Sequence, residues 1–187
     1  MNTNDIRYVL QNKLGSKIYF IGVLSSDQVA SFQIPAFREK SLVFIANILK
    51  RYDRRLGHWV VFLINKSPNN KIFFYDSYGL KPSWYSKDFE SFINKNADYD
   101  LYSHDRKLQS ETSLFCGLYC CHFVYLCSKY EIGRVCQIIK KTFPSSNGAK
   151  NDKKIFDFYN DSLNVIPCNY WKGRKDGLVT YEQCLRN

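Results

Sequence analysis

The segment from Cys116 to Cys127 restricts the fold of this chain more than any other part of its sequence. It is almost uninterrupted apolar sequence and contains no proline. Such a run predicts a buried helix, since a helix that is apolar on every side has no face suited to water. The residues just before it include the helix-capping types Ser110, Thr112 and Ser113. Cys116 is therefore expected in the first turn of the helix.

A cysteine in this position has chemical consequences. The unpaired amides and the dipole at a helix N-terminus favour thiolate over thiol, and a nearby imidazolium would lower the thiol pKa further. Gly117 is expected to leave the approach to the sulfur unobstructed. Gln109 precedes the helix and could present its side-chain N–H to a carbonyl oxygen that becomes negative, an interaction worth about 3 kcal/mol in the transition state.

Two short runs rich in β-branched and aromatic residues predict an antiparallel hairpin. They cover residues 59–64 and 71–75, and the turn-forming sequence 65–70 separates them. His58 and Asp76 flank the two runs at equal sequence distance from the middle of the turn. In that register they face each other, with Cβ atoms roughly 5 Å apart. The hairpin would then hold a carboxylate beside an imidazole.

His58, Asp76, Gln109 and Cys116 together supply the parts of a cysteine hydrolase: a base, a carboxylate that orients it, an oxyanion donor and a nucleophile. Each residue alone has an ordinary structural explanation. A lone His is commonly a surface or satisfied core residue, Asp76 could simply begin a turn, and an isolated Gln carries no signal. We interpret the four as catalytic because few other hypotheses explain all of them at once.

No metal site is expected. Four cysteines and His122 cluster between residues 116 and 127, but they form no Cys-x-x-Cys pair. Adjacent helical residues point about 100° apart, whereas a tetrahedral zinc site needs paired ligands and a second pair at a distance. The other cysteines of this segment, and Cys136 after it, are interpreted as small buried hydrophobic residues; they are Cys120, Cys121, Cys127 and Cys136.

These residues resemble the adenovirus-type maturation proteases, cysteine peptidases related to the proteases of SUMO and ubiquitin-like proteins. The shared marks are His58-Trp59, Asp76, and Gln109 seven residues before Cys116-Gly-Leu-Tyr-Cys-Cys. The N-terminal segment 19–23, with Phe32 and Pro35, is also similar to the viral enzymes. The resemblance runs from about residue 18 to residue 127, which is more than half of the chain.

The resemblance implies a role for each matching residue. His58 would be the general base and Asp76 its orienter. Cys116 would be the acylated nucleophile, and its backbone N–H would form the oxyanion hole together with Gln109. Trp59 would wall a narrow groove that admits only glycine next to the scissile bond, with Gly117 as a second substrate-binding residue.

The same resemblance implies a viral endopeptidase that cleaves structural precursor proteins at glycine-containing sites during particle maturation, in the virion and in the interior of the infected cell. Abundant Lys, Asn, Ile, Tyr and Phe indicate an AT-rich coding genome and favour a virophage or Polinton-like origin. The alternative enzyme is a deconjugating protease for SUMO or ubiquitin-like proteins, which also prefers Gly-Gly before the cut. A third hypothesis is a basic DNA-binding protein that retains an inactive protease fold.

The net charge of +10 raises the question of a polyanionic partner. Residues 1–66 carry ten basic and four acidic side chains, and residues 134–187 carry ten and five. The part between them is close to neutral. These flanks could bind DNA non-specifically with a steep salt dependence, although a solvated surface explains any single basic pair.

Length and cysteine usage set the remaining expectations. A chain of 187 residues predicts a single domain, 1–187, and we expect a monomer. No apolar stretch is long enough to span a membrane, and seven unevenly placed cysteines without an export signal indicate reduced thiols. The chemistry requires no cofactor. DNA or a peptide could act as activator, but no cysteine precedes Cys116, so a disulfide-linked peptide at the usual family position is not expected.

The overall prediction is an α+β cysteine-protease fold, with a buried helix carrying the nucleophile beside a central, mostly antiparallel sheet. Further strands are expected at 17–23, 42–48 and 99–108. Further helices are expected at 5–13, 85–94, 133–141 and 153–163, with a loop at 142–148. The stretch after Val165 shows no pattern.

Overall fold

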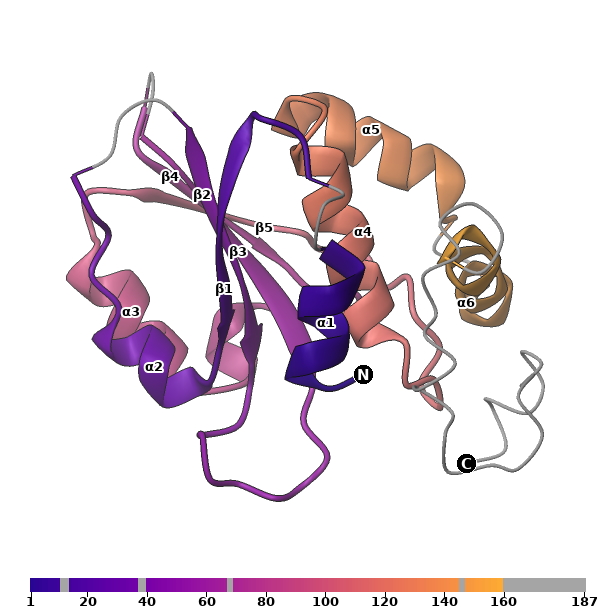
Figure 1. The fold of residues 1–187 in the computed structure, drawn as a ribbon, viewed down its shortest axis with the longest axis horizontal. Coiled ribbons are helices and arrows are strands. Elements are labelled where there is room, and N and C mark those ends of the chain that lie inside the picture. The colour runs from indigo at the N-terminus through magenta and orange to yellow at the C-terminus, as the bar shows by residue number, and fades with distance from the viewer. Residues whose placement is uncertain (11–13, 37–39, 67–68, 145–146, 160–187) are drawn as a thin grey trace.

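The computed structural model describes residues 1–10, 14–36, 40–66, 69–144 and 147–159. Its centre is a five-stranded sheet in the order β1-β2-β3-β4-β5, with helices on both faces (Figure 1). The chain is therefore α+β, as the sequence predicts. The strands are β1 (Ile18–Leu24), β2 (Ser41–Asn47), β3 (Trp59–Asn65), β4 (Lys71–Tyr75) and β5 (Asp100–Ser103).

The sheet is mixed rather than uniform. Its central ladders, β2 with β3 and β3 with β4, are antiparallel, whereas both edge ladders are parallel. Each parallel pair is joined by a connection that carries a helix, α2 (Ser26–Ser31) or α3 (Lys87–Lys95). Parallel neighbours need such a crossover, whereas the short loop between β3 and β4 makes a hairpin. The helix α2 was not predicted.

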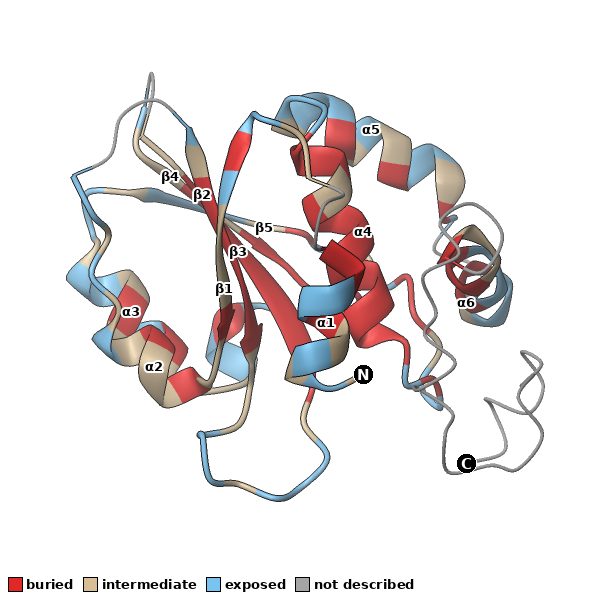
Figure 2. Ribbon diagram, in the orientation of Figure 1, coloured by how far each residue is buried: buried red, intermediate tan, exposed pale blue. Residues whose placement is uncertain are grey.

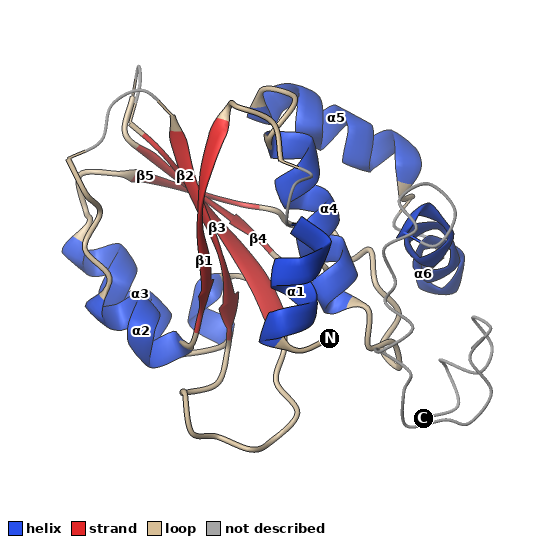
Figure 3. Ribbon diagram, in the orientation of Figure 1, coloured by secondary structure: helices blue, strands red, loops and turns tan. Residues whose placement is uncertain are grey.

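The two faces of the sheet bury separate apolar cores. Helices α2 and α3 cover one face, and α1, α4, α5 and α6 lie on the other (Figure 3). Side chains of β2 and β3 alternate between the two cores, so both strands are buried on both sides. Figure 2 shows that α4 is buried along nearly its whole length. This explains why its sequence lacks a polar stripe.

The helices on the α4 side are α1 (Thr3–Leu10), α4 (Cys116–Cys127), α5 (Ile132–Thr142) and α6 (Gly148–Asp157). The helix that carries Cys116 has the bounds that the apolar run predicts. α6 begins earlier than predicted because the side chain of Asn147 accepts a hydrogen bond from the backbone N–H of Lys150 and caps it. The loop before α6 is correspondingly shorter.

Four other expectations differ from the structure or fall wholly or partly outside it. The predicted strand 99–108 is shorter, because only Asp100–Ser103 pairs with β4. Residues 11–13 of the predicted first helix, the end of the predicted last helix and the stretch after Val165 lie outside the described residues. Among the described residues, no helix has the length and apolarity required to cross a membrane.

Candidate active site

His58 and Asp76 meet at the end of the sheet where β3 begins and β4 ends. The imidazole Nε2 lies 2.6 Å from Oδ1 of Asp76, and both side chains are buried. A bond this short between a ring nitrogen and a carboxylate is typical of a charge-assisted hydrogen bond. The hairpin therefore places the imidazole against the carboxylate, as its sequence predicts.

The predicted register of that hairpin is wrong by two residues. Val61 is paired with Tyr75, so the same ladder continued would set Asp76 opposite residue 60 rather than His58. A shift of two keeps every side chain on its original face of the sheet. Diagonal neighbours remain within reach of long side chains, and the contact between His58 and Asp76 survives for that reason.

Asp76 is held by more donors than the hairpin alone supplies. The backbone N–H groups of Tyr78 and Leu80 donate to its carboxylate over 3.2 and 2.9 Å, and the Tyr85 hydroxyl donates to Oδ2 over 2.8 Å. Burial by itself would raise the pKa of Asp76, but the bonds from His58, Leu80 and Tyr85 outweigh it and lower the pKa. The carboxylate is therefore charged and fixed in orientation.

Two tyrosine rings confine the imidazole. Tyr78 stacks on His58 with ring centroids 4.8 Å apart, and Tyr85 does so at 5.5 Å. Neither tyrosine was identified from the sequence. The turn Asp76-Ser-Tyr-Gly79 was recognised, however, and its Tyr78 lies directly over the ring. Gly79 has a φ of 72°, a left-handed conformation that favours glycine, and this lets the turn fold back over His58.

Cys116 is the first residue of α4 and is 8% exposed. Its thiol lies beside the His58 side chain and the backbone of Trp59. Because Asp76 engages Nε2 of the imidazole, Nδ1 is the ring nitrogen left for the sulfur. The nucleophile, base and carboxylate that the sequence singled out thus form one continuous chain of contacts.

The electrostatics of this chain favour an ion pair. Burial would lower the pKa of His58, but its hydrogen bonds to Asp76 and Cys116 outweigh burial and raise the pKa to about 9. Burial would likewise raise the pKa of Cys116, but the bond to His58 and the charge on its ring lower it. A thiolate beside an imidazolium is the reactive form of a cysteine nucleophile.

Gln109 is buried on the loop before α4 and takes part in a chain of hydrogen bonds. Its Oε1 accepts from the Ser77 hydroxyl over 2.7 Å, and its Nε2 donates to the carbonyl oxygen of Ser113 over 2.7 Å. A side-chain amide carries two N–H donors, so one remains for a substrate oxygen. Ser77 follows Asp76 directly and so links the position of Gln109 to that of the carboxylate.

Helix α6 holds the same loop from the other side. Asn151 donates to the carbonyl oxygen of Leu108 over 3.0 Å. The carboxylate of Asp152 accepts from the backbone and the hydroxyl of Ser110, and from the Tyr119 hydroxyl over 2.9 Å. The loop that carries Gln109 is thereby tied to a segment about forty residues further along the chain.

Met1 covers the two residues that were assigned to a substrate groove. The indole Nε1 of Trp59 donates to the carbonyl oxygen of Met1 over 2.9 Å. A Cβ added to Gly117 would lie 2.7 Å from Sδ of Met1. Met1 therefore packs directly against both Trp59 and Gly117 in this arrangement.

Among the described residues, His104, His122 and the cysteines of α4 other than Cys116 lie in the packed interior. His104 is buried, and its Nδ1 lies 3.2 Å from the backbone carbonyl oxygen of Asp76. Burial lowers the pKa of His122 to about 4 and raises those of Cys120, Cys121 and Cys127. Within the described part of the chain, no three His, Cys, Asp or Glu side chains are grouped so that they could hold a metal ion.

No family model matches the chain, and no curated protein matches it in sequence. Among solved structures, it is similar to the central domain of the uncharacterized Lpg1148 protein from Legionella pneumophila, with a TM-score of 0.52 and 14% identity over 89% of this chain and 98% of that chain. It also aligns with a de-sumoylating protease at a TM-score of 0.44 and 14% identity, over 98% of this chain and 82% of that chain. The first similarity shows a shared fold, and the second is too weak to support a conclusion.

Proposed function

We propose that this protein is a cysteine endopeptidase whose nucleophile is Cys116. The observation that carries the proposal is that the buried His58 ring is hydrogen-bonded to Asp76 and lies beside the Cys116 thiol, whose pKa is lowered. A structural histidine needs a partner, but it does not need a neighbouring thiol with a lowered pKa. Of the five cysteines in the described part of the chain, Cys116 alone has a lowered pKa.

The geometry supports a two-step hydrolysis. The Cys116 thiolate attacks the carbonyl carbon of the scissile bond, and the oxygen that becomes negative accepts hydrogen bonds from Gln109 and the backbone N–H of Cys116. The His58 imidazolium gives its proton to the leaving amine. The neutral ring then takes a proton from water, which attacks the acyl group and releases Cys116. Asp76 keeps the ring oriented and stabilises its charged form.

The proposed substrates are viral structural precursor proteins, cut at glycine-containing sites during particle maturation. This part of the proposal rests on the sequence resemblance around His58-Trp59 and from Gln109 to Cys116. The proposed setting is the virion and the infected cell of a virophage or Polinton-like virus, where DNA or a peptide could raise activity. A protease that removes ubiquitin-like proteins would use the same residues, so substrate competition must separate the two.

The deciding experiment offers both substrate classes to the purified protein. Coat-protein precursors and precursors of SUMO and ubiquitin-like proteins are incubated with the wild type, with Cys116→Ala, and with Cys127→Ala as the matched control. Mass spectrometry identifies the new termini. The proposal expects cleavage of coat precursors after glycine-containing sequence by the wild type and by Cys127→Ala, and no cleavage by Cys116→Ala.

Preferred cleavage of the ubiquitin-like precursors would replace the viral assignment with deconjugation. If Cys116→Ala cleaved as well as the wild type, the cysteine mechanism would be wrong. A titration of salt with and without double-stranded DNA tests the DNA component, which predicts that DNA raises activity only at low salt.

A further inference from the structure

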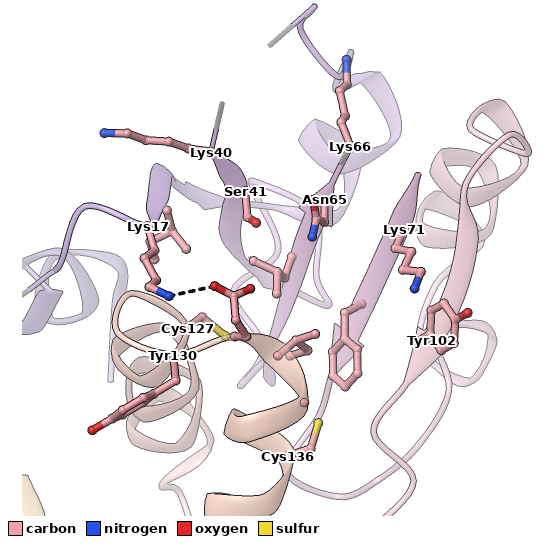
Figure 4. A pocket seen from close by; sticks show the side chains of 16 residues that line it. Lys17, Lys40, Ser41, Asn65, Lys66, Lys71, Tyr102, Cys127, Tyr130 and Cys136 are labelled. Carbon is pink, nitrogen blue, oxygen red and sulfur yellow. Dashed lines mark hydrogen bonds and ion pairs between the residues drawn. The ribbon is translucent and has the colours of Figure 1, made fainter. Parts of the chain in front are cut away.

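A cavity lies at the opposite end of α4 from Cys116. Its volume is about 540 Å³, and it lies between the sheet and the turn that joins α4 to α5 (Figure 4). Cys127, the last residue of α4, lines it. A helix rises 1.5 Å per residue, so this cavity is roughly 17 Å from the nucleophile. We call it the lysine pocket, and it is separate from the candidate active site.

Four lysines surround the mouth of the lysine pocket. Lys17, Lys40, Lys66 and Lys71 come from four segments of the chain, next to or within β1, β2, β3 and β4. In Figure 4, Lys40 and Lys66 extend outward from the cavity, and the Lys66 ammonium donates to the Pro35 carbonyl oxygen over 2.6 Å. Glu131 is the one acidic residue in the lining, and its carboxylate pairs with Lys17 over 2.8 Å. Within the described part of the chain, the other three lysines have no carboxylate partner. The lining therefore carries a net positive charge that favours an anionic ligand.

The lining of the lysine pocket combines apolar and polar groups in about equal amounts. The apolar lining comes from both layers of the fold and consists of Ile18, Leu63, Phe73, Cys127, Ile132 and Cys136. Ser41 and Asn65 lie among them, and Tyr102 and Tyr130 also contribute. A lining of this kind suits a ligand with both hydrogen-bonding groups and apolar side chains, whereas a lipid chain prefers an unbroken apolar wall.

We infer that the lysine pocket binds a short acidic peptide segment that carries an aliphatic or aromatic side chain. The peptide carboxylates pair with the lysines at the mouth, and the apolar side chain fills the interior against Leu63 and Phe73. Nucleic acid fits less well, because a phosphate backbone gains nothing from the apolar side chains of the lining. The cavity volume lies within the range of ordinary ligand pockets, which is enough for a few peptide residues.

The test measures binding without relying on protease activity. The full chain carries Cys116→Ala, so the probe is not cleaved and the result is independent of the proposed function. The probe is a fluorescein-labelled peptide in which glutamate alternates with leucine and phenylalanine. Its binding is measured by fluorescence anisotropy. Two companion peptides replace either all glutamates by glutamine or all apolar residues by serine. The inference expects the first peptide to bind saturably, with an affinity that falls as salt is added. It also expects both companion peptides to bind at least about tenfold more weakly than the first.

Variants then locate the binding site. Lys40→Glu combined with Lys71→Glu is expected to weaken binding at least about tenfold through charge reversal at the mouth. Lys81→Glu combined with Lys87→Glu changes the net charge equally on the α3 side of the sheet, outside the lysine pocket, and is expected to leave binding unchanged. Thermal unfolding shows that each variant is folded.

A third variant tests the cavity without altering charge. Gly133 lines the lysine pocket, and a Cβ added there meets no atom within 4 Å, so Gly133→Leu adds a side chain at a position with open space at Cβ. It is expected to weaken binding about threefold or more, because it narrows the space for the apolar side chain. If the variant with Lys40→Glu and Lys71→Glu bound the acidic peptide as tightly as the control variant with Lys81→Glu and Lys87→Glu, the inference would be overturned. Tighter, pocket-dependent binding of a labelled single-stranded oligonucleotide or of anionic phospholipid vesicles would also overturn it.

Discussion

Tyr85 donates its hydroxyl hydrogen to Oδ2 of Asp76 over 2.8 Å. This is the carboxylate oxygen that His58 leaves open, and the Tyr85 ring also stacks on the imidazole. Burial and the neighbouring Asp76 raise the pKa of Tyr85, so its hydroxyl remains protonated and available as a donor. Tyr85 therefore acts on the base through the carboxylate and is a positioning residue.

Tyr85→Phe keeps the ring and removes the hydrogen bond. A hydrogen bond to a charged group contributes about 1.5–3 kcal/mol, so kcat/KM is expected to fall about tenfold to a hundredfold. The pKa of Asp76 should rise when it loses this donor, and the acid limb of the pH profile should move upward. Tyr78→Phe is the matched control, since its ring also stacks on His58, and it should lose much less activity. An unshifted profile in Tyr85→Phe would reject the positioning role.

The titration of His58 links pH to stability. Its pKa of about 9 in the fold lies above the ordinary value of 6.5, so the folded protein binds this proton more tightly than the unfolded chain. The resulting stabilisation is complete below the ordinary pKa and is lost as the pH rises through about 9. The difference in Tm between the wild type and His58→Gln should therefore be largest in mildly acidic buffer. A difference that grows toward alkaline pH would contradict this assignment.

Thiol reactivity separates Cys116 from its buried neighbours. Iodoacetamide reacts with thiolates, and the lowered pKa of Cys116 contrasts with the raised pKa of Cys127. Cys116 should therefore be alkylated first near neutral pH, as read by peptide mapping. In His58→Gln, the imidazole no longer offsets the effect of burial, so the pKa of the Cys116 thiol should rise and its reactivity near neutral pH should fall. Equal labelling of Cys116 and Cys127 in the wild type would count against the ion pair.

Ser77 fixes the carbonyl end of the Gln109 amide. Ser77→Ala leaves Oε1 of Gln109 buried without this donor, which should lower the free energy of unfolding by about 1–3 kcal/mol. If Gln109 acts on the oxyanion, kcat should fall while KM changes little, because the lost interaction is made in the transition state. Ser128→Ala removes a comparable bond to the Tyr125 carbonyl oxygen at the far end of α4 and should change stability alone.

Two glycines at helix starts should respond to alanine in opposite ways. A Cβ at Gly148 would lie 2.7 Å from the backbone nitrogen of Ser110, and one at Gly133 would meet no atom within 4 Å. Gly133→Ala should stabilise the protein by about 0.5–1 kcal/mol through helix propensity. Gly148→Ala should destabilise it despite the same propensity gain, and should lower activity by displacing the loop of Gln109. Thermal unfolding and peptide hydrolysis measure both effects, and equal Tm shifts would refute the predicted clash.

Local sequence determined much of this fold. The apolar run from Cys116 to Cys127 could satisfy its backbone only as a buried helix, and its bounds agree with the prediction. The hairpin of β3 and β4 follows from two β-rich runs around a short polar loop. The proximity of His58, Asp76 and Cys116 then follows from the packing of that helix on that hairpin.

Other features depended on contacts that no local pattern records. Parallel pairing at both sheet edges depends on where the crossovers of α2 and α3 pack. The hairpin register depends on the turn conformation, which composition does not specify. Tyr85 reaches Asp76 only because the chain turns through the short helix at Pro82–Trp84. Neither its spacing nor its type distinguished it from the other tyrosines of the sequence.

The bonds from Asn151 and Asp152 to the segment Leu108–Ser110 affect the order in which parts of the protein fold during translation. The nucleophile helix leaves the ribosome before α6, which follows it in the chain, so a nascent chain can begin to fold around Cys116 while the loop of Gln109 still lacks its support. On this basis, cleavage competence arises late in translation, after the sheet and the reactive thiol are already in place.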